Sequence, residues 1–194
     1  MKILLTILVL LFSSSVVAED ISDFQIEGMS IGDSLLDFMS EDEIKKALNN
    51  PFIHKDNKFI IIFTNKKNFK NYEIVQVTFK PEDKNYILHA IEGQIESFNN
   101  INECLKIKDE IVEELTELFN DTATTKIDNN KHPYDKTGNT MVYSVFFNIN
   151  SGGVASVECY DWSEVLTSKE NWRDNLNVGT VSEEYDNYLQ TAYD

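Results

Sequence analysis

Cysteine, proline, glycine and basic residues are all scarce in this chain of 194 residues. Two cysteines are too few for a zinc cluster or a disulfide-dense small domain. Seven glycines and three prolines exclude a collagen-like or low-complexity chain. Seventeen basic residues stand against 33 acidic ones, and the formal net charge of −16 would repel phosphate backbones. We therefore expect a globular protein whose partners do not include nucleic acid.

Short catalytic motifs are missing as well. The sequence contains no P-loop, no dinucleotide-binding glycine fingerprint, no G-x-S-x-G elbow and no H-E-x-x-H zinc motif. We therefore predict no cofactor and assign no catalytic residue. Because many enzymes lack such motifs, these absences disfavour catalysis without excluding it.

The first 18 residues have the pattern of a secretory signal peptide. After the basic start at Lys2, the apolar run Ile3–Phe12 is too short to span a bilayer, and Val16-Val17-Ala18 is a small-residue cleavage site. No later segment is apolar enough for a membrane span. We expect an exported periplasmic protein, cleaved near Ala18, whose net charge becomes −17 because Lys2 is lost.

Cys104 and Cys159 are expected to form a disulfide, since an even cysteine count in an exported chain favours pairing. Cys104 lies on the apolar face of a helix predicted over residues 100–119. Cys159 alternates with Ala155 and Val157 on one face of a strand. The bond would tie helix to sheet. The alternative, a redox-active pair, usually needs a close spacing such as C-x-x-C, which is absent.

The order of the predicted elements indicates an α+β fold. Apolar periodicity predicts helices over 33–39, 41–48, 100–119 and 183–192, and strands over 59–63, 72–79, 86–95, 141–147, 154–159 and 176–181. Ser40 and Glu43 form a capping box before the second helix, and residues 120–140 look polar and irregular. We expect residues 19–194 to form a single domain, an antiparallel sheet with helices packed on one face. Two degenerate helix-plus-strands halves, 19–98 and 99–194, are a further option.

The spacing of Ser40, Ile44, Leu48 and Pro51 matches a T-x-x-x-V-x-x-x-L-x-x-P signature. In these residues the N-terminal third resembles outer-membrane assembly lipoproteins of the SmpA/OmlA type, to which the β-lactamase-inhibitor-protein-like superfamily is related. The resemblance implies two short helices before a three-stranded antiparallel sheet, and a protein-binding role in the cell envelope. The lipobox cysteine of that family is absent. The whole chain also resembles exported proteins of marine alphaproteobacteria, which implies no activity.

Metal-binding and histidine chemistry find little support. Residues 128–135 are rich in oxygen ligands, but Pro133 and Asn139 replace the glycine and glutamate of a calcium loop. We therefore predict no metal ligand, although loose screening of the acidic loops by Ca²⁺ stays open. His89 is expected to pack within an apolar layer, whereas His54 and His132 fall in polar loops.

An aromatic-rich region near the C-terminus is the best candidate for a binding site. Aromatic side chains together with Arg and Asp can line a ligand pocket or form an interface hot spot. Alternatively, the tryptophans cover the end of the core. The candidate residues are Tyr160, Asp161, Trp162, Trp172, Arg173 and Tyr185.

Two functional hypotheses follow. The first is a non-catalytic protein-interaction or binding module of the cell envelope, whose acidic surface suits a basic patch on an envelope protein. The second is a small-ligand-binding protein or hydrolase that uses a C-terminal pocket lined by Trp and Tyr. A deep pocket with clustered ionisable groups of shifted pKa would count against the first hypothesis.

Overall fold

The structure, a computed structural model, describes Ala18 and residues 20–54, 56–64, 69–96, 98 and 100–192. Its strands are β1 (Phe52–Ile53), β2 (Ile60–Thr64), β3 (Ile74–Phe79), β4 (Ala90–Ile95), β5 (Ala123–Lys131), β6 (Met141–Ile149), β7 (Val154–Asp161) and β8 (Asn175–Val181). Its α-helices are α1 (Glu41–Ala47), α2 (Ile101–Phe119), α3 (Glu164–Glu170) and α4 (Glu183–Ala192). Short 3-10 turns span Ile21–Asp23, Leu35–Asp37 and Asn120–Thr122.

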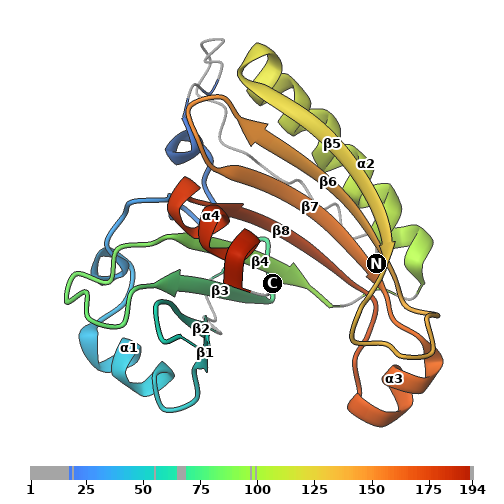
Figure 1. The fold of residues 1–194 in the computed structure, drawn as a ribbon, viewed down its shortest axis with the longest axis horizontal. Helices are drawn as coiled ribbons and strands as arrows, with labels where there is room; N and C mark the ends of the chain where they lie inside the picture. The colour runs from blue at the N-terminus through green and yellow to red at the C-terminus, as the bar shows by residue number, and fades with distance from the viewer. Residues whose placement is uncertain are drawn as a thin grey trace.

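The described strands form one antiparallel sheet of eight, in the order β1-β2-β3-β4-β8-β7-β6-β5 (Figure 1). Strands β1 to β4 and strands β5 to β7 each pair with their neighbours in the sequence, and β8 joins the two groups by pairing with β4 and β7. Every strand pair is antiparallel. This arrangement confirms the predicted α+β class.

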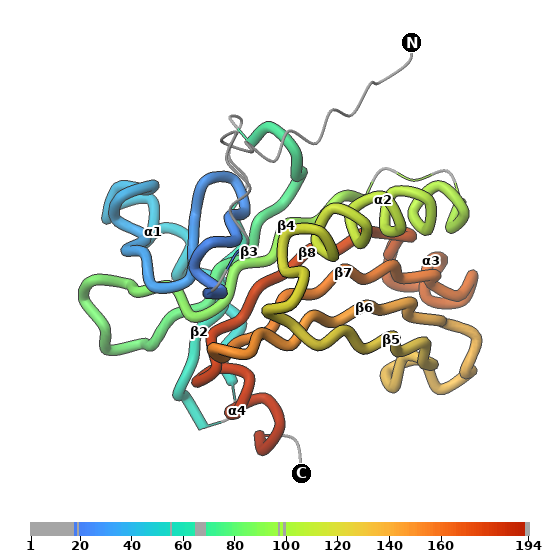
Figure 2. Tube along the Cα trace, turned by 90° about the horizontal axis from the view of Figure 1, so that it is seen from above, coloured from blue at the N-terminus to red at the C-terminus, as the bar shows by residue number. Residues whose placement is uncertain are grey.

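One face of the sheet carries the main core. Apolar residues at alternate strand positions, such as Val77, Val157 and Val178, are buried against α2 and the N-terminal segment. Helix α2 lies along this face (Figure 2), and its first turn is capped by Asn100, whose side chain accepts the amides of residues 102 and 103. The predicted capping box of Ser40 and Glu43 is likewise present at α1.

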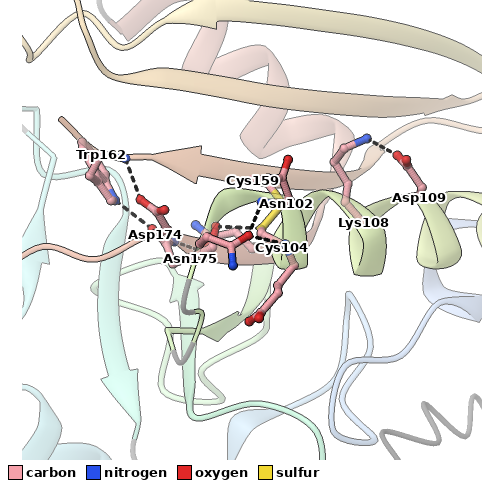
Figure 3. Close-up of a disulfide and its surroundings, with 11 residues drawn as sticks. Asn102, Cys104, Lys108, Asp109, Cys159, Trp162, Asp174 and Asn175 are labelled. Atoms are coloured by element: carbon pink, nitrogen blue, oxygen red, sulfur yellow. Dashed lines mark hydrogen bonds and ion pairs between the residues drawn. A yellow bond between two sulfur atoms is a disulfide. The ribbon is translucent and has the colours of Figure 1, made fainter.

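The predicted disulfide is confirmed and lies in this core. Cys104 of α2 and Cys159 of β7 are bonded, with their Cα atoms 6.0 Å apart (Figure 3). Both residues are fully buried. The bond fixes α2 to the C-terminal group of strands and is consistent with folding in an oxidising compartment.

The opposite face of the sheet is only partly covered. The prediction placed the helices on one face, but α4 lies on the other face from α2 (Figure 2). Tyr185 and Tyr188 of α4 pack with Phe59 and Ala90 in a second, smaller cluster. His54, which we expected in an exposed polar loop, is buried there, and its Nε2 lies 2.9 Å from the Tyr185 hydroxyl. Helix α4 thus covers one part of this face and leaves the rest open.

Two strands and one α-helix were missed by the sequence analysis, and the shortest of them is the two-residue strand β1. Residues 123–131, predicted to be irregular, form the edge strand β5, and α3 follows β7. Strand β5 is exposed at most positions, so it lacks the apolar alternation that marks a strand. In α3 a single residue, Leu166, is buried, which is too little to produce a visible helical period.

The predicted signal peptide lies outside the described residues, except for Ala18. That residue is buried, and its amide donates a hydrogen bond to the Leu118 carbonyl. Among the described residues, none of the helices is long and apolar enough to cross a membrane.

Candidate functional site: a groove on the open face

A groove of about 590 Å³ lies on the open face of the sheet, over β3, β4, β8 and β7. This volume is typical of sites for small molecules. Polar side chains from the strands form its floor, and aromatic residues from β7 and from the loops after β5 and α3 form one wall. The lining residues are Glu73, Gln76, Glu92, Gln94, Glu96, His132, Tyr160, Trp162, Asn171, Trp172, Arg173, Asn175 and Asn177.

Strand alternation explains why the floor is polar. Val75 and Val77 of β3 point into the core, so Gln76 between them points to the open face. The antiparallel register pairs Gln76 with Glu92 of β4, and the next open-face pair along β4 and β8 joins Gln94 with Asn177. Three adjacent strands therefore contribute polar side chains to one continuous surface.

A chain of hydrogen bonds crosses this floor and ends at Glu92. The Trp162 indole Nε1 donates to the Asn175 side-chain oxygen over 2.8 Å, and the Asn175 amide donates to the Asn177 oxygen over 2.7 Å. The Asn177 amide then donates to Oε1 of Glu92 over 3.0 Å, and the Gln76 amide donates to the same oxygen. Every donor in the chain is neutral, and the carboxylate is the terminal acceptor.

A second carboxyl lies next to this chain. Glu158 of β7 accepts hydrogen bonds from the Ser144 hydroxyl over 2.7 Å and from the Tyr160 hydroxyl over 3.4 Å. A Cβ atom placed on Gly179 of β8 would lie 3.7 Å from Cγ of Glu92. The Glu92 side chain therefore lies over β8, the strand that separates it from Glu158.

Burial raises the pKa of both carboxyls. Glu92 is half-buried and lines the groove. Loss of hydration, followed by repulsion from Glu158, raises the pKa of Glu92 to about 8, while the Gln76 hydrogen bond opposes the shift. Burial also raises the pKa of Glu158, against the opposing hydrogen bonds from Ser144 and Tyr160. The groove therefore contains a carboxyl that titrates near neutral pH.

The aromatic wall is a packed cluster. The ring centroids of Trp162 and Trp172 are 4.6 Å apart, and His132 lies 4.9 Å from Trp162. The Tyr160 ring stacks on Trp162 at 5.5 Å. Burial lowers the pKa of His132, which favours its neutral form. These contacts hold the rings in place before any ligand binds.

Polar contacts from both sides fix the backbone of the wall. The Trp162 amide donates to the Asp174 carboxylate over 3.0 Å (Figure 3). In the loop after β5, the Asp135 carboxylate accepts the amides and hydroxyls of Thr137 and Thr140, and these bonds hold its pKa well below the usual range. The Asp135 carboxylate therefore stabilises the loop through these hydrogen bonds. Within the described residues, no cluster of His, Cys, Asp and Glu has the geometry of a metal site.

The structure brings together four of the six predicted site residues. Tyr160, Trp162, Trp172 and Arg173 line the groove. Asp161 falls on the alternate position of β7 and is not among the lining residues. Tyr185 belongs to α4, where its side chain is buried against His54. Asp161 and Tyr185 are therefore not part of the lining of the groove.

Sequence reasoning missed the floor of the groove. Glu92 and Asn177 are 85 positions apart, and nothing in the sequence shows that β4 and β8 are paired. The available signal was the polar residue between apolar ones in each strand, for example Gln76 between Val75 and Val77. His132 was also missed, because a histidine in a polar loop is ordinary.

Comparisons with known proteins leave the family open. No family model matches the sequence, and no curated protein matches it. The resemblance to SmpA/OmlA-type lipoproteins therefore gains no support. The structure is similar to the solution structure of the cyanobacterial PsbP (CyanoP) of Synechocystis sp. PCC 6803, with a TM-score of 0.35 and 8% identity, over 74% of this chain and 86% of that chain. This distant likeness concerns the fold alone.

Proposed function

We propose that the protein binds a small polar ligand in the groove on the open face of its sheet. One observation carries the proposal. In a groove of about 590 Å³, aromatic residues around Trp162 and Trp172 form a wall beside a floor of side-chain amides and carboxyls. Ligand sites combine apolar walls with a few fixed polar groups in this way. The hydrogen bonds that hold Trp162 and Asn175 support a preformed site, which lowers the entropic cost of binding.

Among the two hypotheses from the sequence, the small-ligand reading fits this groove better. The groove holds ionisable groups with shifted pKa, the feature that counts against a purely non-catalytic interaction module. The envelope location, the interaction-module role and a basic protein partner stay predictions. The hydrolase variant also stays a prediction, and Glu92 is its candidate acid because a carboxyl with a pKa of about 8 keeps its proton at neutral pH.

The test uses the intrinsic fluorescence of the protein. The chain has two tryptophans, and both line the groove, so tryptophan emission reports directly on this site. We expect a panel of amines, sugars and small carboxylates to include at least one class that changes this emission in a saturable way. Trp172→Ala should weaken that binding by roughly fivefold or more, because truncating a central aromatic contact costs more than about 1 kcal/mol.

The matched control is Tyr185→Phe. Tyr185 was a predicted site residue, but it lies in α4 against His54 and does not line the groove. The Tyr185→Phe variant should bind the same ligand class with the affinity of the wild type. Trp162→Ala is the second groove variant, and circular dichroism must show that it remains folded. If no class on the panel binds, or if Tyr185→Phe and Trp172→Ala behave alike, the proposed function is wrong.

A further inference from the structure

We propose that the ligand of this groove is a protonated organic amine with an apolar or aromatic tail, the ammonium lying at the Glu92–Glu158 end and the tail against Trp162 and Trp172. This inference rests on the proposed function and specifies its ligand class. It comes from the distribution of charge and aromatic surface along the groove.

The groove is rich in negative charge and poor in positive charge. Three carboxyl groups line it, from Glu73, Glu92 and Glu96, and the Glu158 carboxyl accepts a hydrogen bond from the lining residue Tyr160. Among the described lining residues, Arg173 is the one basic residue besides His132. Arg173 is exposed, and burial favours the neutral form of His132. The acidic groups would repel an anionic ligand and attract a cationic one.

The two deepest carboxyls have no internal cation. Glu92 and Glu158 form no ion pair with any described lysine or arginine, and their hydrogen-bond donors are amides and hydroxyls. Buried carboxylates are ordinarily paired with a cation, because desolvation is costly otherwise. Here the cost appears as raised pKa values in both residues. An ammonium group from a ligand would supply the missing counter-charge.

One carboxylate oxygen is available for this role. Oε1 of Glu92 accepts both amides of the floor, from Asn177 and Gln76. Oε2 accepts no hydrogen bond from a described residue and belongs to a side chain that lines the groove. Because a protonated amine has only donors, it suits an open carboxylate oxygen beside a second carboxyl.

The aromatic wall suits the other end of such a ligand. Open-face residues continue along β7 from Glu158 to Tyr160, and Trp162 follows just after the strand ends, so acidic and aromatic surface follow one another along this part of the chain. Aromatic faces attract cations and stack on apolar rings. An arylalkylamine therefore matches the order of groups along the groove.

The experiment compares tyramine with two close analogues by isothermal titration calorimetry on the oxidised protein. Tyrosol carries a hydroxyl in place of the ammonium, and phloretate carries a carboxylate. We expect tyramine to bind roughly tenfold tighter than tyrosol, because the ammonium forms charge-assisted hydrogen bonds, and phloretate to bind weakest. Tyramine binding should also strengthen as pH rises from 6 to 8, because the carboxyls must lose their protons to pair with it, and the heat should depend on the buffer.

Variants then locate the interaction. Glu92→Gln and Glu158→Gln should each reduce the preference for tyramine over tyrosol by several-fold, and tyrosol affinity should change little. The control is Glu113→Gln on the exposed side of α2, away from the groove, which should keep the wild-type preference. Thermal denaturation of each variant checks that it is folded.

Three results would overturn the amine assignment. If tyramine and tyrosol bind equally, or if Glu92→Gln and Glu158→Gln keep the full preference, the groove selects its ligand by other chemistry, and the proposed function still stands. If none of the three probes binds at millimolar concentration, the arylalkylamine class is excluded. The wider panel with Trp172→Ala then decides the proposed function separately.

Discussion

The two faces of the sheet use the same strands in opposite ways. On the α2 face, alternate residues such as Val77, Val157 and Val178 are buried in an apolar core closed by a disulfide. On the open face, the intervening positions carry Gln76, Glu92 and their polar neighbours, joined by directed hydrogen bonds. The first face gains free energy by excluding water. On the open face, holding polar groups partly out of water costs free energy. Such a cost is typical of a functional surface.

The comparison teaches where each kind of residue matters. A change on the α2 face should alter stability and leave binding unaffected, whereas a change on the open face should alter binding and the pH dependence of stability. The two faces meet at Asn175 of β8. Its carbonyl oxygen lies 3.4 Å from the Cys104 sulfur, and its side chain accepts the Trp162 indole (Figure 3).

Breaking the disulfide is expected to have the largest effect. The bond closes a loop with a sequence separation of 55, and in the chain-entropy model its removal destabilises the protein by about 4 kcal/mol. Cys104→Ala combined with Cys159→Ala should lower the free energy of unfolding by this order in urea denaturation. Reduction of the wild type with dithiothreitol is the matched comparison. A loss below about 1 kcal/mol would show that the α2 face does not depend on this bond.

The open face should reveal itself in the pH dependence of stability. An unfolded glutamate titrates near about 4.3, whereas Glu92 in the folded protein has a pKa of about 8. Between these values the folded state holds a proton that unfolding releases. The contribution of Glu92 therefore falls as pH rises through this window, by at most about 1.4 kcal/mol per pH unit, and levels off above the folded pKa.

Urea denaturation of the wild type and Glu92→Gln at several pH values checks this contribution. The variant should lose less stability between pH 5 and pH 8 than the wild type, because its amide does not titrate. Glu113→Gln, on the other side of the molecule, should retain the wild-type slope. Parallel curves for the wild type and Glu92→Gln would contradict the raised pKa.

The smallest predicted effect is a gain on the α2 face. Thr180 of β8 is fully buried, and its hydroxyl has no hydrogen-bond partner among the described residues. Replacing a buried unsatisfied hydroxyl with a methyl group of similar size removes a desolvation cost. Thr180→Val should therefore stabilise the protein by about 1 kcal/mol in thermal or urea denaturation. Thr180→Ser keeps the hydroxyl and should give no gain.

The sequence predicted features that depend on local patterns. Cys104 and Cys159 each lie on an apolar face that can be recognised within a few residues, so their bond could be inferred. Trp162 and Trp172 could be proposed as site residues because aromatic residues cluster in that part of the chain. The floor of the groove was not found, because Glu92 and Asn177 become neighbours only through the β4–β8 pairing. Strand β5 was missed because an exposed edge strand has no buried face to impose alternation, and its one large apolar residue, Ile127, is 72% exposed.

The position of β8 also has a consequence for how the chain is made. Among the described strands this one comes last in the sequence, yet it lies in the middle of the sheet between β4 and β7. Until residues 175–181 leave the ribosome, both neighbouring strands present unpaired edges, which are open to pairing with other chains. The sheet can close only after β8 has emerged. A nascent chain that stops before residue 175 would lack β8, the strand that joins β4 to β7, and would be prone to aggregate.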